Sequence, residues 1–346
     1  MDPHTIELPR IVLVGNNLLE KLPDVCKEIG IEKGILVLAD RTTRYIIGDK
    51  AKEMLQAAGL STNFDIVHDS TDTEVDRIGA RNKPGLVIAA GGGKVIDVAK
   101  MVAYRNDRPF ISVPTAPSHD GIASERASIS GWDGSKYSLR AKPPIAIIAD
   151  IGMLKSAPYR LIASGAADVI SNNTAVHDWK LAAQAKSEYY SEYAASLSLL
   201  SSEIVINSAA MIKDLEDRGI RNLVEALISS SISMSLVGSS RPASGAEHAF
   251  SHALEILGSK ALHGEQCGIG SILMAHHQGQ DWEGIKDALA AVGAPTTTKQ
   301  LGISDDKAIE ALLEAKNIRD RYSILDEKPL DRKAAGQLCR ETGVFG

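Results

Sequence analysis

The chain of 346 residues is 44% hydrophobic but only 4% aromatic, so aliphatic side chains must build its core, and its length predicts two domains or one with a large helical annex. Its 38 basic and 44 acidic residues give a net charge of -6 with no basic tract, which argues against a nucleic-acid partner. No apolar run reaches the ~18 residues of a membrane span, no signal-peptide pattern is present, and the three cysteines form no C-x-x-C pair. We therefore expect a cytoplasmic protein without a disulfide framework, in which any metal would be bound by His, Asp or Glu.

Short aliphatic runs recur along the first half, each followed by a turn and usually by a helical pattern. Near-continuous apolar strands that alternate with helices predict a parallel sheet covered on both faces. Ligands of such sheets bind outside the carboxyl ends of the strands, so functional residues are expected there. The predicted strands are residues 10–15, 35–40, 64–68, 86–90, 110–114 and 145–150.

Asp40 ends the second run. A carboxylate at this point can accept hydrogen bonds from the ribose of a nicotinamide dinucleotide and would repel the extra phosphate of NADP. It can also begin the helix that follows, since Asp favours such positions. Both interpretations stay open.

A glycine turn, Gly91 to Gly93, and Lys94 follow the fourth run and lead into a helical pattern. Glycines let the backbone approach a ligand, and the N–H groups of a helix start favour a phosphate or pyrophosphate. The spacing matches neither the common dinucleotide fingerprint nor the P-loop. The alternative is a turn that only lets strand and helix pack closely.

The loop after the fifth run gathers the polar residues Thr115, Ser118, His119, Asp120 and Ser124. Loops at the carboxyl end of a strand commonly hold ligands, which favours a binding loop over a polar surface turn.

Residues 127–139 predict a β-hairpin around Asp133 and Gly134, because an Asp-Gly pair tolerates the positive φ angles of a tight turn. Beyond Asp150 the strand pattern stops and helical periodicity runs to the end of the chain. We therefore expect an α/β domain at 1–150, a helical domain at 151–346, and the active site in the cleft between them.

Possible metal ligands lie in three segments of the helical half. Asp168 lies in a helix of small and apolar residues, where a buried carboxylate is costly unless it binds a cation or is well hydrogen-bonded. His248 and His252 share one helix face, and His263 precedes a glycine. Asp168, His248 and His263 would leave the open position of a catalytic zinc, but His252 competes with His248, and each histidine alone is more often a core or surface residue.

Five motifs in order along the chain carry a resemblance that covers nearly all of it: GGGKVIDVAK, PTAPSHDGIASERASI, GAADVISNNTAV, SGAEHAFSHALE and ALHGEQCGIG. With them the chain closely resembles the archaeal sn-glycerol-1-phosphate dehydrogenases of the iron-containing or zinc-dependent alcohol dehydrogenase group. That group also includes glycerol dehydrogenase and dehydroquinate synthase. The resemblance implies a dehydroquinate synthase-like fold, with a Rossmann-like dinucleotide-binding domain before an all-α metal- and substrate-binding domain, and a homo-oligomer.

The implied reaction is the NAD- or NADP-dependent interconversion of glycerone phosphate and sn-glycerol 1-phosphate, which supplies the backbone of archaeal membrane phospholipids. Zinc is expected to act as a Lewis acid on the C2 oxygen during hydride transfer. The motifs SHDGIAS and SGAEHAFSH separate the chain from glycerol dehydrogenases and favour a phosphate ester. A zinc-dependent glycerol or polyol dehydrogenase and a lyase like dehydroquinate synthase are the alternatives.

The resemblance also implies roles for individual residues. Asp168, His248 and His263 match the ligands of one zinc ion per subunit, which settles the competition with His252. Asp168, Asp120 and His252 match positions that contact the substrate, and a proton would pass through water, His252 or Asp120. The phosphate-binding residues stay unassigned, with Arg126, Lys260, Asn172 and Asn173 as possibilities. The matched dinucleotide-binding positions are Gly93, Lys94, Val95, Ile96, Asp97, Thr115, Ala116, Pro117, Ser118 and Ser124.

Overall fold

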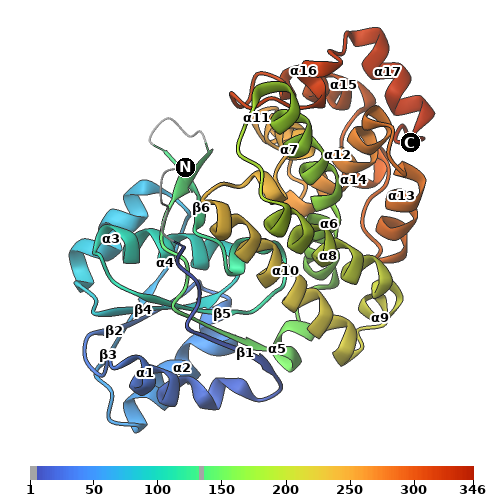
Figure 1. The fold of residues 1–346 in the computed structure, drawn as a ribbon. Helices are drawn as coiled ribbons and strands as arrows, with labels where there is room; N and C mark the ends of the chain where they lie inside the picture. The colour runs from blue at the N-terminus through green and yellow to red at the C-terminus, as the bar shows by residue number, and fades with distance from the viewer. Residues whose placement is uncertain (1–5, 132–135) are drawn as a thin grey trace. The chain divides into compact units, whose positions relative to one another are not determined.

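The computed structural model describes residues 6–131 and 136–346 and divides into two compact units, residues 1–158 and 159–346 (Figure 1). The first unit is an α/β sheet domain and the second is helical, as predicted. The boundary predicted after Asp150 stays a prediction: the two compact units divide between Pro158 and Tyr159, and the short helix α5 (Ile151–Lys155) belongs to the first unit. Within the described residues, every helix is too short or too polar to cross a bilayer.

The six predicted strands are all present, with bounds that differ by at most two residues, and they form one parallel sheet in the order β1-β8-β5-β4-β2-β3. β2, β4, β5 and β8 are buried along their whole length, which explains their continuous apolar sequence. The strands are β1 (Ile11–Gly15), β2 (Ile35–Ala39), β3 (Thr62–Ile66), β4 (Leu86–Gly91), β5 (Phe110–Pro114) and β8 (Ala146–Asp150).

Helices cover both faces of this sheet (Figure 1). Leu22 of α1 and Leu55 of α2 are fully buried in one core cluster with Val37 and Ile88 of the sheet. The helices of this unit, besides α5, are α1 (Leu22–Ile29), α2 (Asp49–Ala57), α3 (Asp72–Asn82) and α4 (Gly93–Arg105).

The strand order brings three predicted binding segments to one edge of the sheet. β4 lies between β2 and β5, and Gly91 at the end of β4 is in register with Pro114 at the end of β5. The segments that begin at Asp40, at the glycine turn and at Thr115 therefore leave the sheet at neighbouring positions.

A predicted hairpin projects from the sheet domain. β6 (Arg126–Ser130) pairs antiparallel with β7 (Lys136–Arg140), with Ala127 opposite Leu139. The prediction of two paired strands is confirmed, whereas its Asp133–Gly134 turn lies outside the described residues.

The second unit is built around α12, which packs against α6 and α11. Gly264, in the first turn of α12, allows a close approach: a Cβ here would lie 1.9 Å from the backbone oxygen of Ser164 on α6. This contact presses the start of α12, with His263, against α6. The helices of this unit are α6 (Tyr159–Ile170), α7 (Asn172–Lys186), α8 (Glu192–Asn207), α9 (Ala209–Lys213), α10 (Asp217–Val237), α11 (Ala246–Ile256), α12 (His263–Gln278), α13 (Trp282–Ala291), α14 (Thr298–Leu301), α15 (Asp305–Ala315), α16 (Ile324–Glu327) and α17 (Arg332–Glu341).

Candidate functional site

The glycine turn has one open side and one packed side. The N-cap of α4 is Gly92, in extended conformation at φ -81° and ψ -172°, and a Cβ there would meet nothing within 4 Å. A Cβ on Gly93 would instead lie 2.3 Å from Nε2 of His119. The backbone at Gly92 is therefore accessible, as an anion site at a helix N-terminus requires, while Gly93 makes room for the imidazole.

Asp40 serves the local turn and also pairs with the glycine segment. Its Oδ1 accepts hydrogen bonds from the backbone N–H groups of Thr42 and Thr43, and its Oδ2 lies 3.3 Å from Nζ of Lys94. Burial raises the pKa of Asp40, but the hydrogen bonds from Thr43 and the charge of Lys94 outweigh it, so the pKa lies below its ordinary value. Asp40 is therefore a carboxylate at neutral pH, in contact with a cation.

The buried side chain of Lys100 anchors the loop that follows β5. Lys100 is the last residue of the motif GGGKVIDVAK, but the sequence did not indicate this role. Lys100 is fully buried, and its Nζ donates to the backbone oxygens of Gly121 and Arg126, both at 2.6 Å. Asp97 and Ser124 lie around the same ammonium group, at 3.7 and 3.4 Å. These two predicted dinucleotide-binding side chains therefore stabilise the loop from within.

The remaining predicted dinucleotide-binding residues fall into two sets. Gly93, Lys94 and Ser118 keep exposed or half-buried surface, whereas the others are buried. The buried set, besides Asp97 and Ser124, consists of Val95, Ile96, Thr115, Ala116 and Pro117. Desolvation and the charge of Lys100 lower the pKa of the neighbouring His119 to about 4, so this imidazole is neutral at physiological pH.

The structure brings Asp168, His248 and His263 together at one point. Nε2 of His248 and Nε2 of His263 each lie 3.7 Å from Oδ1 of Asp168. Asp168 comes from α6, His248 from α11 and His263 from the start of α12. The side chains of Asp168 and His248 are nearly buried, but His263 is 30% exposed, so the cluster is closed on one side and accessible on the other.

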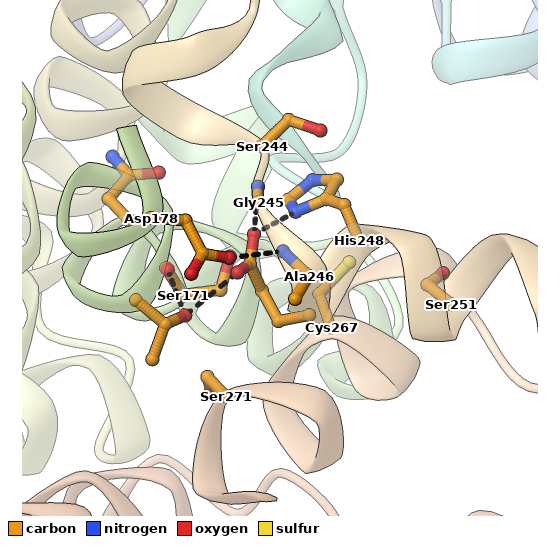
Figure 2. Close-up of polar contacts among 12 residues, drawn as sticks. Ser171, Asp178, Ser244, Gly245, Ala246, His248, Ser251, Cys267 and Ser271 are labelled. Carbon is orange, nitrogen blue, oxygen red and sulfur yellow. Dashed lines mark hydrogen bonds and ion pairs between the residues drawn. The ribbon is translucent and has the colours of Figure 1, made fainter. Parts of the chain in front are cut away.

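Hydrogen bonds orient both imidazoles. Nδ1 of His248 lies 2.9 Å from Oε1 of Glu247, and Nδ1 of His263 lies 3.2 Å from Oγ of Ser251. Figure 2 shows the network around His248, in which the N–H of Gly245 donates to the same Oε1 at 2.6 Å. With Nδ1 engaged in this way, each ring directs Nε2 towards Asp168.

This donor set fits a divalent metal ion. A tetrahedral zinc with bonds of about 2.1 Å separates its ligand atoms by roughly 3.4 Å, close to the 3.7 Å observed from Asp168 Oδ1 to each imidazole. Burial and the neighbouring positive charges hold the pKa of His248 well below its ordinary value, so its Nε2 keeps the lone pair that a metal needs. One carboxylate and two imidazoles leave a coordination position for a substrate oxygen.

From the sequence we expected any metal to be bound by His, Asp or Glu, and the structure adds the thiol of Cys267 to the possible ligands. Its Sγ lies 3.6 Å from Nε2 of His263 and belongs to the same cluster, in which the possible ligand atoms all lie within 4.8 Å of one another. The two residues are four apart on α12 and so share a helix face. Burial and the charge of Asp168 raise the pKa of Cys267 well above its ordinary value, so the group is a neutral thiol.

His252 lies beside this cluster and outside it. Its ring centroid is 5.9 Å from that of His263, and its Nε2 accepts a hydrogen bond from Nη2 of Arg319 at 2.8 Å. Its Nδ1 lies 3.5 Å from Oε2 of Glu255. Of the two histidines of α11, His248 therefore belongs to the group of possible metal ligands and His252 lies beside it.

Two residues considered for phosphate binding are engaged elsewhere. The amide of Asn172 is buried and donates to Oγ of Ser230, and that of Asn173 donates to Oγ of Ser202. Both amides tie neighbouring helices of the second unit together.

A buried pair of carboxylic acids supports α11, and the sequence did not point to it. Asp178 accepts hydrogen bonds from the N–H groups of Ala246 and Ile324, and Glu247 contacts the hydroxyl of Thr174 at 3.0 Å (Figure 2). Burial raises the pKa of both Asp178 and Glu247 to about 7. The only feature of the sequence that could have indicated a role for Glu247 is its position next to His248, a potential metal ligand.

Comparison with known proteins places this geometry in context. Residues 13–158 match the iron-containing alcohol dehydrogenase family. The chain is 48% identical to glycerol-1-phosphate dehydrogenase [NAD(P)+] of Pyrococcus furiosus over 99% of this chain and 100% of that protein, and 48% identical to its counterpart in Methanothermobacter thermautotrophicus over the full length of both. A probable glycerol dehydrogenase from Sinorhizobium meliloti has a similar structure, with a TM-score of 0.81 over 98% of each chain but 20% identity, which supports the fold alone.

Proposed function

We propose that this chain, which belongs to the glycerol-1-phosphate dehydrogenases of the iron-containing alcohol dehydrogenase group, interconverts glycerone phosphate and sn-glycerol 1-phosphate with NAD or NADP. The observation that carries the proposal is the meeting of Asp168, His248 and His263 in a chain whose full-length relatives are named for this activity. A dehydrogenase of a polar alcohol needs a group that stabilises negative charge on the reacting oxygen. A divalent metal ion can do this, and these three side chains are suited to bind one.

The residues of the metal site would fix an ion and leave one side accessible. Asp168, His248 and His263 would be its ligands, and Glu247 would keep the ring of His248 in the required orientation. When bound, zinc supplies a Lewis acid beside the C2 oxygen, while the nicotinamide supplies or accepts the hydride. His252 and Asp120 are proposed to contact the substrate and to pass its proton to or from solvent.

The dinucleotide is proposed to bind at the carboxyl edge of the sheet. The open backbone at Gly92 would take its pyrophosphate at the N-terminus of α4. Asp40 would face the ribose, and because Lys94 compensates its charge at 3.3 Å, the extra phosphate of NADP would meet less repulsion than a lone carboxylate would cause. We therefore expect both coenzymes to be accepted.

The family resemblance also supports a homo-oligomer that works in the cytoplasm and supplies the glycerophosphate backbone of archaeal phospholipids. Light scattering coupled to gel filtration would test the oligomer, and a single-subunit mass would contradict it.

A coupled assay tests the proposed reaction. Glycerone phosphate should oxidise NADH or NADPH, a chelator should abolish this oxidation, zinc should restore it, and the product should be sn-glycerol 1-phosphate. Faster turnover of dihydroxyacetone would favour a polyol dehydrogenase instead. Loss of substrate without net oxidation of the coenzyme would favour a lyase.

A further inference from the structure

A basic cavity of about 680 Å³ opens in the helical unit beside the loop between α15 and α16. Five of its lining side chains are cationic and three are carboxylates. Arg241 is buried, and Glu188 compensates its charge through two hydrogen bonds. On the loop itself, Lys316 lies 3.9 Å from Oδ1 of Asp326, and Asp320 stands between Arg319 and Arg321. Arg319, Asp320 and Arg321 together leave one net positive charge on this wall of the cavity, which favours an anion.

Arg319 connects this cavity to the metal cluster. Its Nη1 donates to Oγ of Ser244 at 3.1 Å, and its Nη2 donates to Nε2 of His252 at 2.8 Å. The ring of His252 is in turn 5.9 Å from that of His263. The guanidinium group is therefore separated from the proposed metal ligands by a single side chain.

The contact with Arg319 fixes the role of Nε2 of His252 as a hydrogen-bond acceptor. Because Nη2 of Arg319 can only donate, Nε2 of His252 must accept, and the ring proton lies on Nδ1, which faces Oε2 of Glu255 at 3.5 Å. The lone pair of Nε2 is then occupied by the guanidinium. In this arrangement His252 cannot accept a proton from a substrate through that atom.

We infer that Arg319 recognises the phosphate of the substrate and that binding of the phosphate draws the guanidinium away from His252. The inference rests on the proposed function and assigns a phosphate-recognition residue that the sequence left open. A phosphate dianion accepts two parallel hydrogen bonds from a guanidinium and binds it more strongly than a neutral imidazole nitrogen does. In glycerone phosphate the ester lies beside the reacting C2 carbon, so one small molecule can reach both groups.

This exchange links substrate recognition to chemistry. Until a phosphate arrives, Nε2 of His252 is bound to Arg319. Once the guanidinium has moved, this nitrogen can take the proton of the C2 hydroxyl during oxidation, or pass a proton taken from solvent to the C2 oxygen during reduction. Binding energy from the non-reacting phosphate would then raise turnover as well as affinity. Dihydroxyacetone, which lacks the phosphate, would leave His252 occupied.

The test compares purified R319A with wild-type enzyme on glycerone phosphate and on dihydroxyacetone, with bound zinc and melting temperature measured for each protein. R319A should lose about 100-fold or more in kcat/KM for glycerone phosphate, with zinc retained. On dihydroxyacetone R319A should be at least as fast as the wild type, because Nε2 of His252 is no longer bound by the guanidinium. R319K, which keeps the charge but not the two-pronged geometry, should be intermediate. R332A is the matched control, because Arg332 pairs with Asp306 at the surface of the same unit.

Two rescue experiments separate recognition from a structural role. Guanidinium ions should restore part of the glycerone phosphate turnover of R319A, and phosphite should stimulate dihydroxyacetone reduction by the wild type but not by R319A. Equal losses on both substrates, an unchanged preference for the phosphate ester, or transfer of the effect to R321A would each overturn the inference. A wild type that does not turn over glycerone phosphate would instead refute the proposed function, so the two failures are distinguishable.

Discussion

The carboxyl edge of the sheet and the metal cluster of the helical unit are built in opposite ways. At the sheet edge, the accessible backbone of Gly92 is the proposed binding surface, and the buried side chain of Lys100 holds a neighbouring loop. In the helical unit, the side chains of Asp168, His248 and His263 form the site, and the helix backbones only carry them. A backbone site can be recognised from one short motif, whereas a side-chain site depends on the packing of distant helices.

The largest expected effect is the loss of activity when a metal ligand is replaced, and it distinguishes His248 and His263 from His252. H248A and H263A should each lose bound zinc and reduce turnover by about 1000-fold or more, because each removes one of three ligands. H252A should reduce turnover while zinc stays bound. Metal content by atomic absorption, together with steady-state rates, measures both. Full activity in metal-free H263A would reject the metal mechanism, and zinc loss in H252A would show that the face of α11 is wrongly assigned.

The next largest effect is expected on zinc affinity when Glu247, which orients the ring of His248, is replaced. E247A should weaken zinc binding about 10- to 100-fold, because the ring of His248 loses its anchor. E247Q retains an oxygen that can accept from Gly245 and Nδ1 of His248, so it should stay within a fewfold of the wild type. Competition with a fluorescent chelator measures the affinity. If E247A binds zinc like the wild type, the orienting role is refuted.

The backbone site can be tested by adding a single methyl group. G92A should leave the melting temperature of the coenzyme-free protein unchanged, because its Cβ enters open space, but should weaken NADH binding about tenfold if the pyrophosphate lies against this backbone. Calorimetric titration measures the affinity. G93A is the contrasting variant and should be destabilised, since its Cβ would meet His119 at 2.3 Å. Unaltered NADH affinity in G92A would place the coenzyme elsewhere.

The smallest effect concerns the pH dependence of stability in the helical unit. The folded-state pKa of Asp178 is raised by burial from 3.8 to about 7, so the folded protein retains a proton that the unfolded chain releases. The stability that this group contributes is fully present below the unfolded-state pKa and is lost as the pH rises to about 7, at about 1 kcal/mol per pH unit.

D178N lacks the titrating group and should show a shallower decline of stability over the same pH range, although it is less stable at acidic pH because one acceptor becomes a donor facing the N–H of Ala246. Urea unfolding of the metal-free proteins from pH 4 to 8 measures both slopes. Parallel curves for D178N and the wild type would argue against a raised pKa at Asp178.

The amino-acid sequence by itself determined the elements whose signals are local. The six aliphatic runs became strands, and four of them are buried along their whole length because continuous apolar character favours burial on both faces of a sheet. The glycines after β4 predicted a backbone site, at which Gly92 has open space and Gly93 makes room for His119. Spacing also showed that His248 and His252 share a face of α11. The choice between them came from the resemblance alone.

Only the tertiary structure decided how distant side chains combine. The meeting of His263 with Asp168 depends on Gly264 letting α12 approach the backbone of α6, and no spacing in the sequence encodes that contact. Cys267 and Arg319 became relevant for the same reason, since each is an ordinary residue until packing places it beside a histidine. The physical reason is that hydrophobic periodicity fixes which face of a helix is buried, while side-chain shape at the contacts fixes which buried faces meet.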